Sequence, residues 1–194
     1  MSLDYKIIGI SGSARSGKDT LGNNMMKILL DNGIESNVLS FANSLKCSVD
    51  DFLIDQTGIS AFTEDEDEKR LIRPFLVCWG TDIMRSINDN IWIEKLERDL
   101  SDKQVNIITD VRFPNELEWI KEKKGLTVFI NRTGIEPAND YEKENNRILS
   151  EEADNNFCIG NFENEKYLEL TANEILNSMI NQDIFETWKA TCHS

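Results

Sequence analysis

The sequence predicts an α/β fold in which a parallel, five-stranded sheet is covered by helices on both faces. Short apolar runs rich in β-branched residues alternate with amphipathic segments along the chain, and a glycine-rich stretch separates the first such pair. Buried strands that alternate with helices are typical of parallel sheets with both faces covered. The 194 residues, of which 40% are hydrophobic, suffice for one domain with insertions. We therefore expect one domain over residues 1–194.

The expected strands are short, and the first, KIIGIS, is a continuous apolar run of the kind found inside parallel sheets. Breaker residues bound the others, which are less apolar at their ends. The five expected strands cover residues 6–11, 37–42, 105–109, 126–131 and 157–160.

The expected helices lie between these runs. Leu21, Met25 and Leu29 recur at helical spacing after the glycine-rich stretch. Pro74 lies inside a helical pattern and predicts a kink or a restart there, whereas Pro114 suits the first turn of a helix. Further helices are expected near residues 90–100 and 166–181.

The charge balance excludes some partners. The chain has 21 basic and 35 acidic residues and a formal net charge of −14. Nucleic-acid polymers are bound by neutralising their phosphates with Lys and Arg, so such a polymer is not an expected partner. A local cluster of amides and arginines can still bind a small anion, such as a nucleotide. The composition therefore favours a small-molecule ligand.

Cysteine, histidine and hydropathy limit the chemistry and the location further. The four cysteines are scattered without a C-x-x-C pair, and His193 is the only histidine. A zinc site or a histidine base is thus not expected. No apolar run approaches the roughly 18–20 residues of a membrane span, and the N-terminus lacks a signal-peptide core. We expect a cytoplasmic protein without membrane contact.

A phosphate-binding loop is the strongest signal in the chain. The pattern G-x-x-x-x-G-K lets successive backbone amides turn toward phosphate oxygens, while the lysine reaches the outer phosphates. A strand precedes this stretch and an amphipathic helix follows it, as the motif requires. Asp19 stands where the basic motif has Ser or Thr, and the hydroxyl follows at Thr20. The residues expected to bind ATP phosphates are Gly12, Ser13, Ala14, Arg15, Ser16, Gly17, Lys18, Asp19 and Thr20.

This loop alone does not separate kinases from GTPases and motor ATPases. No N-K-x-D guanine-reading motif is present, and residues 131–134 lack both its Lys and its Asp. The chain is also small and acidic for an ATPase that moves along a polymer. A kinase remains the best supported of the three classes.

A second group of polar residues, T-D-V-R-F-P-N-E, follows an expected buried strand. Asp110 should then lie at the carboxyl edge of the sheet, where open α/β folds bind their ligands. An acid there can hold Mg²⁺ or orient an acceptor oxygen, and Arg112 can steady a transferring phosphoryl group. Alternatively, Asp110 caps the helix that begins at Pro114, and Arg112 forms a surface ion pair.

Taken in order along the chain, these motifs resemble the phage-type deoxynucleoside monophosphate kinases. The matching pieces are R-S-G-K-D-T, S-F-A-N-S-L-K, W-G-T-D-I-M-R, I-W and D-V-R-F-P-N-E, followed by Ser150-Glu151 before the last strand. The resemblance extends from about residue 6 to residue 176. It implies a P-loop nucleotide-kinase fold with ATP and Mg²⁺ as the donor pair and a deoxynucleoside monophosphate as acceptor.

The resemblance also implies functions for single residues. Lys18, Asp110, Arg112 and Arg85 would be catalytic, and Thr20 and Asp110 would lie on the metal side. Residues 43–104 would form a helical acceptor-binding insertion, and residues 132–150 a lid-like segment that begins with Arg132. The acceptor would be contacted by Phe41, Lys46, Arg73, Arg85, Trp92, Glu116 and Glu151.

Several of these residues have ordinary structural alternatives. Phe41 and Trp92 can be core residues, and Lys46 and Arg73 can be solvated surface charges. Two other functions also remain open, namely a kinase of another small metabolite, such as phosphomevalonate or dephospho-coenzyme A, and a non-catalytic nucleotide-binding regulator. A homodimer is compatible with the sequence.

Overall fold

The computed structural model describes residues 6–159 and 165–181, and the side chains of 6–159 and 168–177. Cys192 and His193, like the end of the fifth expected strand at Gly160, lie outside the described residues. The chain divides into two compact units. The first is Met1–Leu39 with Leu100–Ser194, and the second is Ser40–Asp99. Each unit is described by itself.

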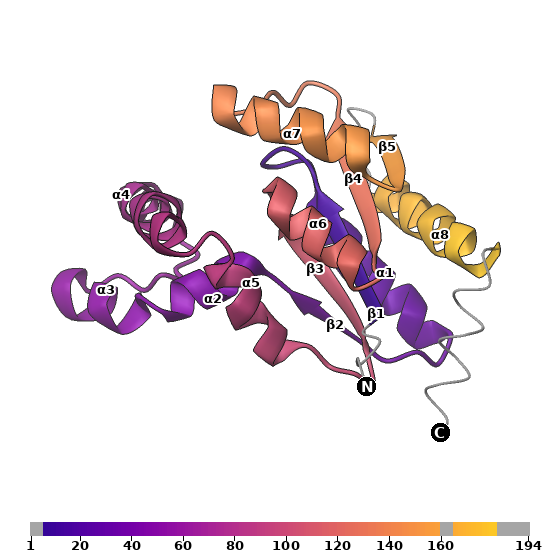
Figure 1. Cartoon of the computed structure of the whole chain (residues 1–194), viewed down its shortest axis with the longest axis horizontal. Helices are drawn as coiled ribbons and strands as arrows, with labels where there is room; N and C mark the ends of the chain where they lie inside the picture. The colour runs from indigo at the N-terminus through magenta and orange to yellow at the C-terminus, as the bar shows by residue number, and fades with distance from the viewer. Residues whose placement is uncertain (1–5, 160–164, 182–194) are drawn as a thin grey trace. The chain divides into compact units, whose positions relative to one another are not determined.

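The first unit contains the parallel five-stranded sheet that the sequence predicts. Neighbouring strands pair in parallel in the order β2-β3-β1-β4-β5, so the central strand is β1 (Figure 1). The second expected strand ends earlier than predicted because Ser40 starts a helix, and the third is longer. The strands are β1 (Lys6–Ser11), β2 (Ser36–Leu39), β3 (Val105–Val111), β4 (Leu126–Arg132) and β5 (Asn155–Ile159).

Helices cover both faces of this sheet, as expected (Figure 1). Alternate strand residues such as Ile8, Ile107 and Val128 form one buried cluster with the apolar sides of α1 (Lys18–Asp31) and α8 (Glu165–Asn181). The opposite face meets α6 (Pro114–Glu122), and α7 (Asp140–Glu152) contacts α6. A Cβ on Gly9 would lie 2.3 Å from Ile120 Cδ1 of α6, so the Ile120 side chain packs directly on the backbone of β1 there.

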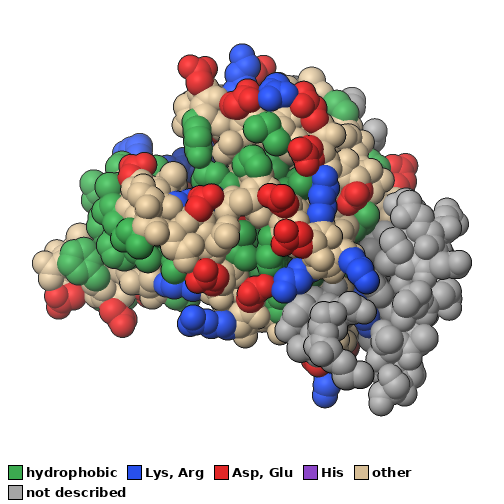
Figure 2. All heavy atoms as spheres, in the orientation of Figure 1, with side chains coloured by type: hydrophobic (Ala, Val, Ile, Leu, Met, Phe, Trp, Pro, Cys, Tyr) green, Lys and Arg blue, Asp and Glu red, His purple; other side chains and the backbone are tan. Residues whose placement is uncertain are grey.

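The second unit is helical, and its described residues contain no strand. It occupies Ser40–Asp99, where the sequence predicts an insertion over residues 43–104. Val49, Leu53, Ala61 and Ile72 form one buried cluster in it. Several large apolar side chains of α3 and α4 are exposed, and hydrophobic atoms gather on the visible face of this unit (Figure 2). The elements are α2 (Phe41–Cys47), α3 (Asp50–Thr57), α4 (Glu66–Val77), η1 (Cys78–Arg85), α5 (Ile91–Leu96) and η2 (Glu97–Asp99).

Of the two outcomes expected at Pro74, a kink or a restart, the structure contradicts the restart, and the kink stays a prediction. Helix α4 continues through Pro74 to Val77, and the backbone changes to a π-helix only at Cys78. A proline removes one hydrogen bond to the carbonyl four residues earlier, here that of Arg70. Arg70 and Pro74 are both exposed, so water can satisfy this carbonyl and the helix tolerates the proline.

Within the described residues, no helix is both long enough and apolar enough to cross a membrane.

Candidate phosphate-binding site

The loop between β1 and α1 has a backbone that requires glycine at both ends of the motif. Gly12 has a φ of 139°, and a Cβ there would lie 2.2 Å from the carbonyl oxygen of Ile130. Gly17 has a φ of 98° and is the N-cap of α1. Arg15, at the exposed outer turn, also has a positive φ, of 65°. The spacing of the two glycines therefore follows from a tight turn that ends at a helix N-terminus.

Lys18, the first residue of α1, folds its side chain back over this loop. Its Nζ donates hydrogen bonds to the carbonyl oxygens of Gly12 at 2.8 Å and Ser13 at 2.7 Å. The residue is only 8% exposed. The ammonium is thus held at the loop that it is expected to serve.

The charges around Lys18 identify the groups that lie near it. Burial lowers the Lys18 pKa from 10.5 to about 8, and the Arg112 charge acts in the same direction. Asp19, Asp110 and Glu142 oppose this effect by stabilising the ammonium. The structure therefore brings Asp110 and Arg112, from β3 and the loop after it, to the surroundings of the phosphate loop.

Asp19 and Thr20 have different surroundings in the first turn of α1. The Asp19 Oδ1 accepts a hydrogen bond from the Thr109 hydroxyl of β3 at 2.7 Å. Gly22, one turn along α1, packs closely on Thr109, because a Cβ on Gly22 would lie 2.5 Å from Thr109 Cγ2. The Asp19 carboxylate therefore helps to join α1 to β3. Thr20 is half-buried.

Asp110 lies inside the end of β3. The strand continues to Val111, and Asp110 is 8% exposed. The N-cap of α6 is Phe113, and the capping carboxylate is that of Glu116. Glu116 Oε2 accepts hydrogen bonds from the backbone amides of Arg112 at 2.8 Å and Phe113 at 3.0 Å. Glu116 therefore supplies this capping contact, and a further contribution of Asp110 to the start of α6 stays a prediction.

Glu116 and Arg112 differ in exposure. Glu116 is 2% exposed and holds the backbone of the D-V-R-F turn, so a structural function accounts for it. Its expected contact with an acceptor stays a prediction. The Arg112 side chain is exposed beside the loop, where a guanidinium can meet a phosphoryl group.

Sequence reasoning missed two residues of α7 that contact the loop. Glu142 Oε1 accepts a hydrogen bond from the Ala14 amide at 3.1 Å, and Asn146 Nδ2 donates to the Ser13 hydroxyl at 3.0 Å. The only readable signal was Asn139 three residues before Glu142, a pattern that predicts a helix start. It does not predict a contact with a loop more than a hundred residues away.

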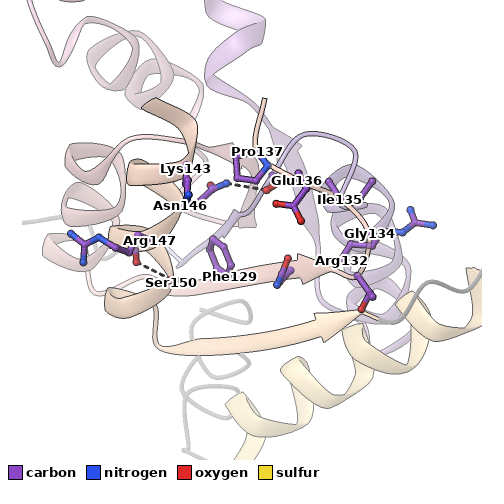
Figure 3. A pocket seen from close by; sticks show the side chains of 13 residues that line it. Phe129, Arg132, Gly134, Ile135, Glu136, Pro137, Lys143, Asn146, Arg147 and Ser150 are labelled. Carbon is purple, nitrogen blue, oxygen red and sulfur yellow. Dashed lines mark hydrogen bonds between the residues drawn. The ribbon is translucent and has the colours of Figure 1, made fainter. Parts of the chain in front are cut away.

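A pocket of about 440 Å³ adjoins the loop (Figure 3). Ser13, the end of β4 with the segment after it, and one side of α7 form its walls. Arg132, the predicted lid residue, lines it together with Lys143 and Arg147. The Arg147 guanidinium is bonded to Glu144 and to Glu151, at 2.7 Å to Glu151 Oε2. The expected acceptor contact of Glu151 stays a prediction.

The other residues predicted for the acceptor side lie in the second unit. Phe41 is 4% and Trp92 3% exposed, and Trp92 Nε1 donates to the Gly80 carbonyl oxygen at 2.9 Å. This burial agrees with the alternative that Phe41 and Trp92 are core residues. Arg85 is also buried, and its guanidinium lies 2.9 Å from the Asp89 carboxylate.

Lys46 and Arg73 are more accessible. The Lys46 ammonium lies 5.4 Å from the centre of the Phe62 ring, in the geometry of a cation–π contact. Arg73 is exposed on α4. Contacts of these residues with an acceptor stay predictions.

The fold and the loop together define a class of protein. A parallel sheet with β1 at its centre delivers a glycine-bounded loop to the N-terminus of α1, and Lys18 lies over that loop. This is the arrangement of a P-loop nucleotide-binding protein.

Comparisons with known proteins give the family. The family model described as phosphomevalonate kinase matches residues 10–126, which is more than half of the chain. A provisionally named deoxynucleotide monophosphate kinase of Acanthamoeba polyphaga mimivirus is 31% identical, over 71% of this chain and 80% of the viral protein. The chain therefore belongs to the P-loop kinase family that the phosphomevalonate kinase model describes, and the viral kinase is a relative of it. The resemblance to deoxynucleoside monophosphate kinases is confirmed at this level.

Solved structures give looser matches. A gluconokinase from Sinorhizobium meliloti 1021 is 10% identical with a TM-score of 0.46, covering 91% of this chain and 97% of that one. The Mycobacterium tuberculosis APS kinase CysC, in complex with AMPPNP and APS, is 12% identical with a TM-score of 0.41, covering 89% and 96%. At these scores the two likenesses carry no argument about substrate.

Proposed function

We propose that this kinase transfers the γ-phosphoryl group of ATP to a deoxynucleoside monophosphate and forms the diphosphate and ADP. The observation that carries the reaction is Lys18 lying over the glycine-bounded loop, with Asp110 and Arg112 near it. The acceptor class is supported by the viral relative, which is named a deoxynucleotide monophosphate kinase.

The donor side would use groups that the first unit already places at the loop. Loop amides at the N-terminus of α1 would bind the β- and γ-phosphates, and the Lys18 ammonium would turn from the two carbonyl oxygens to them. Arg132 in the adjoining pocket would serve the lid side of the nucleotide.

Mg²⁺ fits this donor set. The described residues contain no group of three or more acidic, Cys or His side chains that could hold a metal alone. Phosphoryl-transfer sites usually hold Mg²⁺ through one or two protein oxygens, substrate phosphates and water, so no such cage is required. Thr20 and Asp110 would supply the protein oxygens, and the ion would neutralise charge on the donor phosphates.

The transfer itself needs positioning more than covalent chemistry from the protein. An oxygen of the acceptor monophosphate attacks the γ-phosphorus of ATP, and the bond from that phosphorus to the β,γ-bridging oxygen breaks. Asp110 would orient the attacking group or the water shell of the metal. Lys18 and Arg112 would stabilise the negative charge on the transferred group and on the leaving ADP.

The acceptor side rests on the predicted residues of the second unit and on two acids of the first. Arg73 and Arg85 would bind the acceptor phosphate, because guanidinium groups form paired hydrogen bonds with phosphate oxygens. Phe41, Lys46 and Trp92 would border the base and sugar, and Glu116 and Glu151 would contribute polar contacts.

A second candidate function is a kinase of another small phosphorylated metabolite. The observation that favours it is the match of residues 10–126 to the phosphomevalonate kinase model. The two candidates share the donor loop and differ only in the acceptor. A regulator that binds nucleotides without phosphoryl transfer is less well supported, since the chain belongs to a kinase family.

A coupled assay of ADP release, run with ATP and Mg²⁺, separates these functions. The acceptor panel holds the deoxynucleoside and ribonucleoside monophosphates, phosphomevalonate and dephospho-coenzyme A. We expect ADP release above the ATP-only background with at least one deoxynucleoside monophosphate. Release with phosphomevalonate alone would establish the second candidate, and a flat response to the whole panel would contradict both.

A further inference from the structure

The carboxylate of Glu142 occupies a place on the phosphate loop that suits an anion. Its Oε1 accepts the hydrogen bond of the Ala14 amide at 3.1 Å. Ala14 is the third residue of the motif, and the backbone amides of such loops are donors to phosphate oxygens. A side chain of α7 therefore uses a donor that the loop would offer to a ligand.

The second oxygen of this carboxylate has an ordinary structural function. Glu142 Oε2 accepts from the Ala138 amide at 2.6 Å, and the Glu142 amide donates to Asn139 Oδ1 at 2.8 Å. These two bonds form the start of α7. Capping of α7 requires only this one oxygen of Glu142, so the bond to Ala14 is additional to it.

Two further observations place α7 against the loop. Asn146, one turn beyond Glu142, donates to the Ser13 hydroxyl. Two side chains of α7 therefore contact two neighbouring residues of the loop, Ser13 and Ala14. The Glu142 charge also raises the pKa of Lys18, which shows that the carboxylate lies within electrostatic reach of that ammonium. A carboxylate bound to a loop amide near the loop lysine has the surroundings of a phosphate oxygen.

We propose that Glu142 is an internal competitor of the donor phosphates, which closes the N-terminal end of α7 over the phosphate loop until a nucleotide displaces it. The proposal rests on the proposed use of this loop for ATP. One amide hydrogen cannot serve both a carboxylate and a phosphate oxygen in good geometry, and two anions at that point repel each other. Binding of the donor would therefore release the carboxylate and open this contact.

Glu142→Gln separates the competing contact from the helix cap. The amide oxygen of Gln can still accept from Ala138, whereas its NH₂ group cannot accept from Ala14. The variant also removes the negative charge from the surroundings of Lys18. Asp140→Asn is the matched control, because Asp140 is exposed and loses the same charge from the same helical turn.

The test is isothermal titration of ATP into the wild type, Glu142→Gln and Asp140→Asn, with tripolyphosphate as a second ligand. We expect ATP and tripolyphosphate to bind Glu142→Gln at least about fivefold more tightly than the wild type. The Asp140→Asn protein should bind within about twofold of the wild type. A melting temperature close to that of the wild type shows that the cap of α7 survives in Glu142→Gln.

Each other outcome has a distinct meaning. If the wild type and Glu142→Gln bind ATP with equal affinity, the proposal that Glu142 competes with the donor phosphates is wrong. The loop would then still be an ATP site. Equal tightening by Asp140→Asn also overturns that proposal, because the effect would then be one of net charge. If none of the three proteins binds ATP or tripolyphosphate, the proposed donor function fails, and the competitor fails with it.

Discussion

Asp19 of α1 accepts a hydrogen bond from the Thr109 hydroxyl of β3, 2.7 Å away, directly beside the phosphate loop. The carboxylate that replaces the usual hydroxyl residue after Lys18 is thus engaged with the sheet. Thr20, one position later, carries the hydroxyl that the motif otherwise supplies. Which of these two residues serves the metal and which stabilises the fold can be measured.

We predict that Thr20→Ala raises the Mg²⁺ concentration needed for half-maximal activity more than Asp19→Ala does. Asp19→Ala should instead destabilise the fold by about 0.5–1.5 kcal/mol, the usual contribution of one hydrogen bond. Mg²⁺ titrations of initial rates and thermal melts of both variants check this. A larger Mg²⁺ effect in Asp19→Ala would show that the carboxylate serves the metal.

The pH dependence of ATP binding follows from the lowered pKa of Lys18, about 8 in the ligand-free protein. The ammonium is present below this pH and is lost above it, so the ATP affinity should fall as pH rises through about 8. Lys18→Arg stays charged throughout and should not show this fall. Dissociation constants for ATP between pH 6.5 and pH 9.5 provide the check. A wild-type affinity that is constant over this range would contradict the assignment of Lys18.

The lowered pKa of Lys18 also affects stability: the ATP affinity should fall as pH rises, whereas the free energy of unfolding should rise. Between about 8 and 10.5 the unfolded chain binds the Lys18 proton more strongly than the folded chain does. The free energy of unfolding should therefore gain a contribution from Lys18 as pH rises through this window. Lys18→Met lacks this contribution, so the difference in unfolding free energy between wild type and variant should change with pH there. Urea melts at pH 7, 8.5 and 10 measure it.

Variants of Asp110 and Glu116 should have different effects, the first on turnover and the second on the stability of the fold. Asp110→Asn keeps the shape of the side chain, so it should melt close to the wild type while kcat falls at least roughly 10²-fold. Glu116→Ala leaves the amides of Arg112 and Phe113 without their buried acceptor, which costs about 1–3 kcal/mol for an unsatisfied group. Thermal melts and steady-state kinetics of both variants test this pairing. Normal turnover in a stable Asp110→Asn protein would remove Asp110 from the catalytic group.

Arg73 and Arg85 should affect the acceptor far more than ATP. Arg73→Lys removes the paired hydrogen bonds that a guanidinium forms with phosphate, so the KM for the monophosphate should rise by roughly tenfold. Arg85→Lys should behave likewise and also melt lower, because Arg85 is buried and paired with Asp89. Dissociation constants for ATP should stay within about twofold of the wild type. A loss of ATP binding with an unchanged acceptor KM would contradict the assignment.

The sequence predicted those parts of the fold that depend on local signals. Strand β1 has the predicted bounds Lys6–Ser11, and α6 begins at Pro114 as expected. The phosphate loop was also predictable, since its two glycines, its lysine and the flanking strand and helix are all neighbours in the chain. Each of these signals lies within a few residues of the feature that it specifies.

The remaining features depend on contacts between distant residues. Nothing near Glu142 indicates that it bonds to Ala14, which is 128 positions away. Strand β3 continues past its expected end to Val111, so Asp110 is a strand residue, and Glu116 accepts the amide of Phe113 at the start of α6. Periodicity cannot show that α4 continues through Pro74 to Val77.

The most direct test of the proposed function is ³¹P NMR of the wild-type protein with ATP, Mg²⁺ and the best deoxynucleoside monophosphate of the panel. We predict that the β-phosphorus signal of a deoxynucleoside diphosphate appears together with that of ADP, in equal amounts and at the same rate. Lys18→Ala, folded by circular dichroism, should slow both signals by on the order of 10³-fold. Formation of ADP with free phosphate and without a deoxynucleoside diphosphate would contradict phosphoryl transfer to this acceptor.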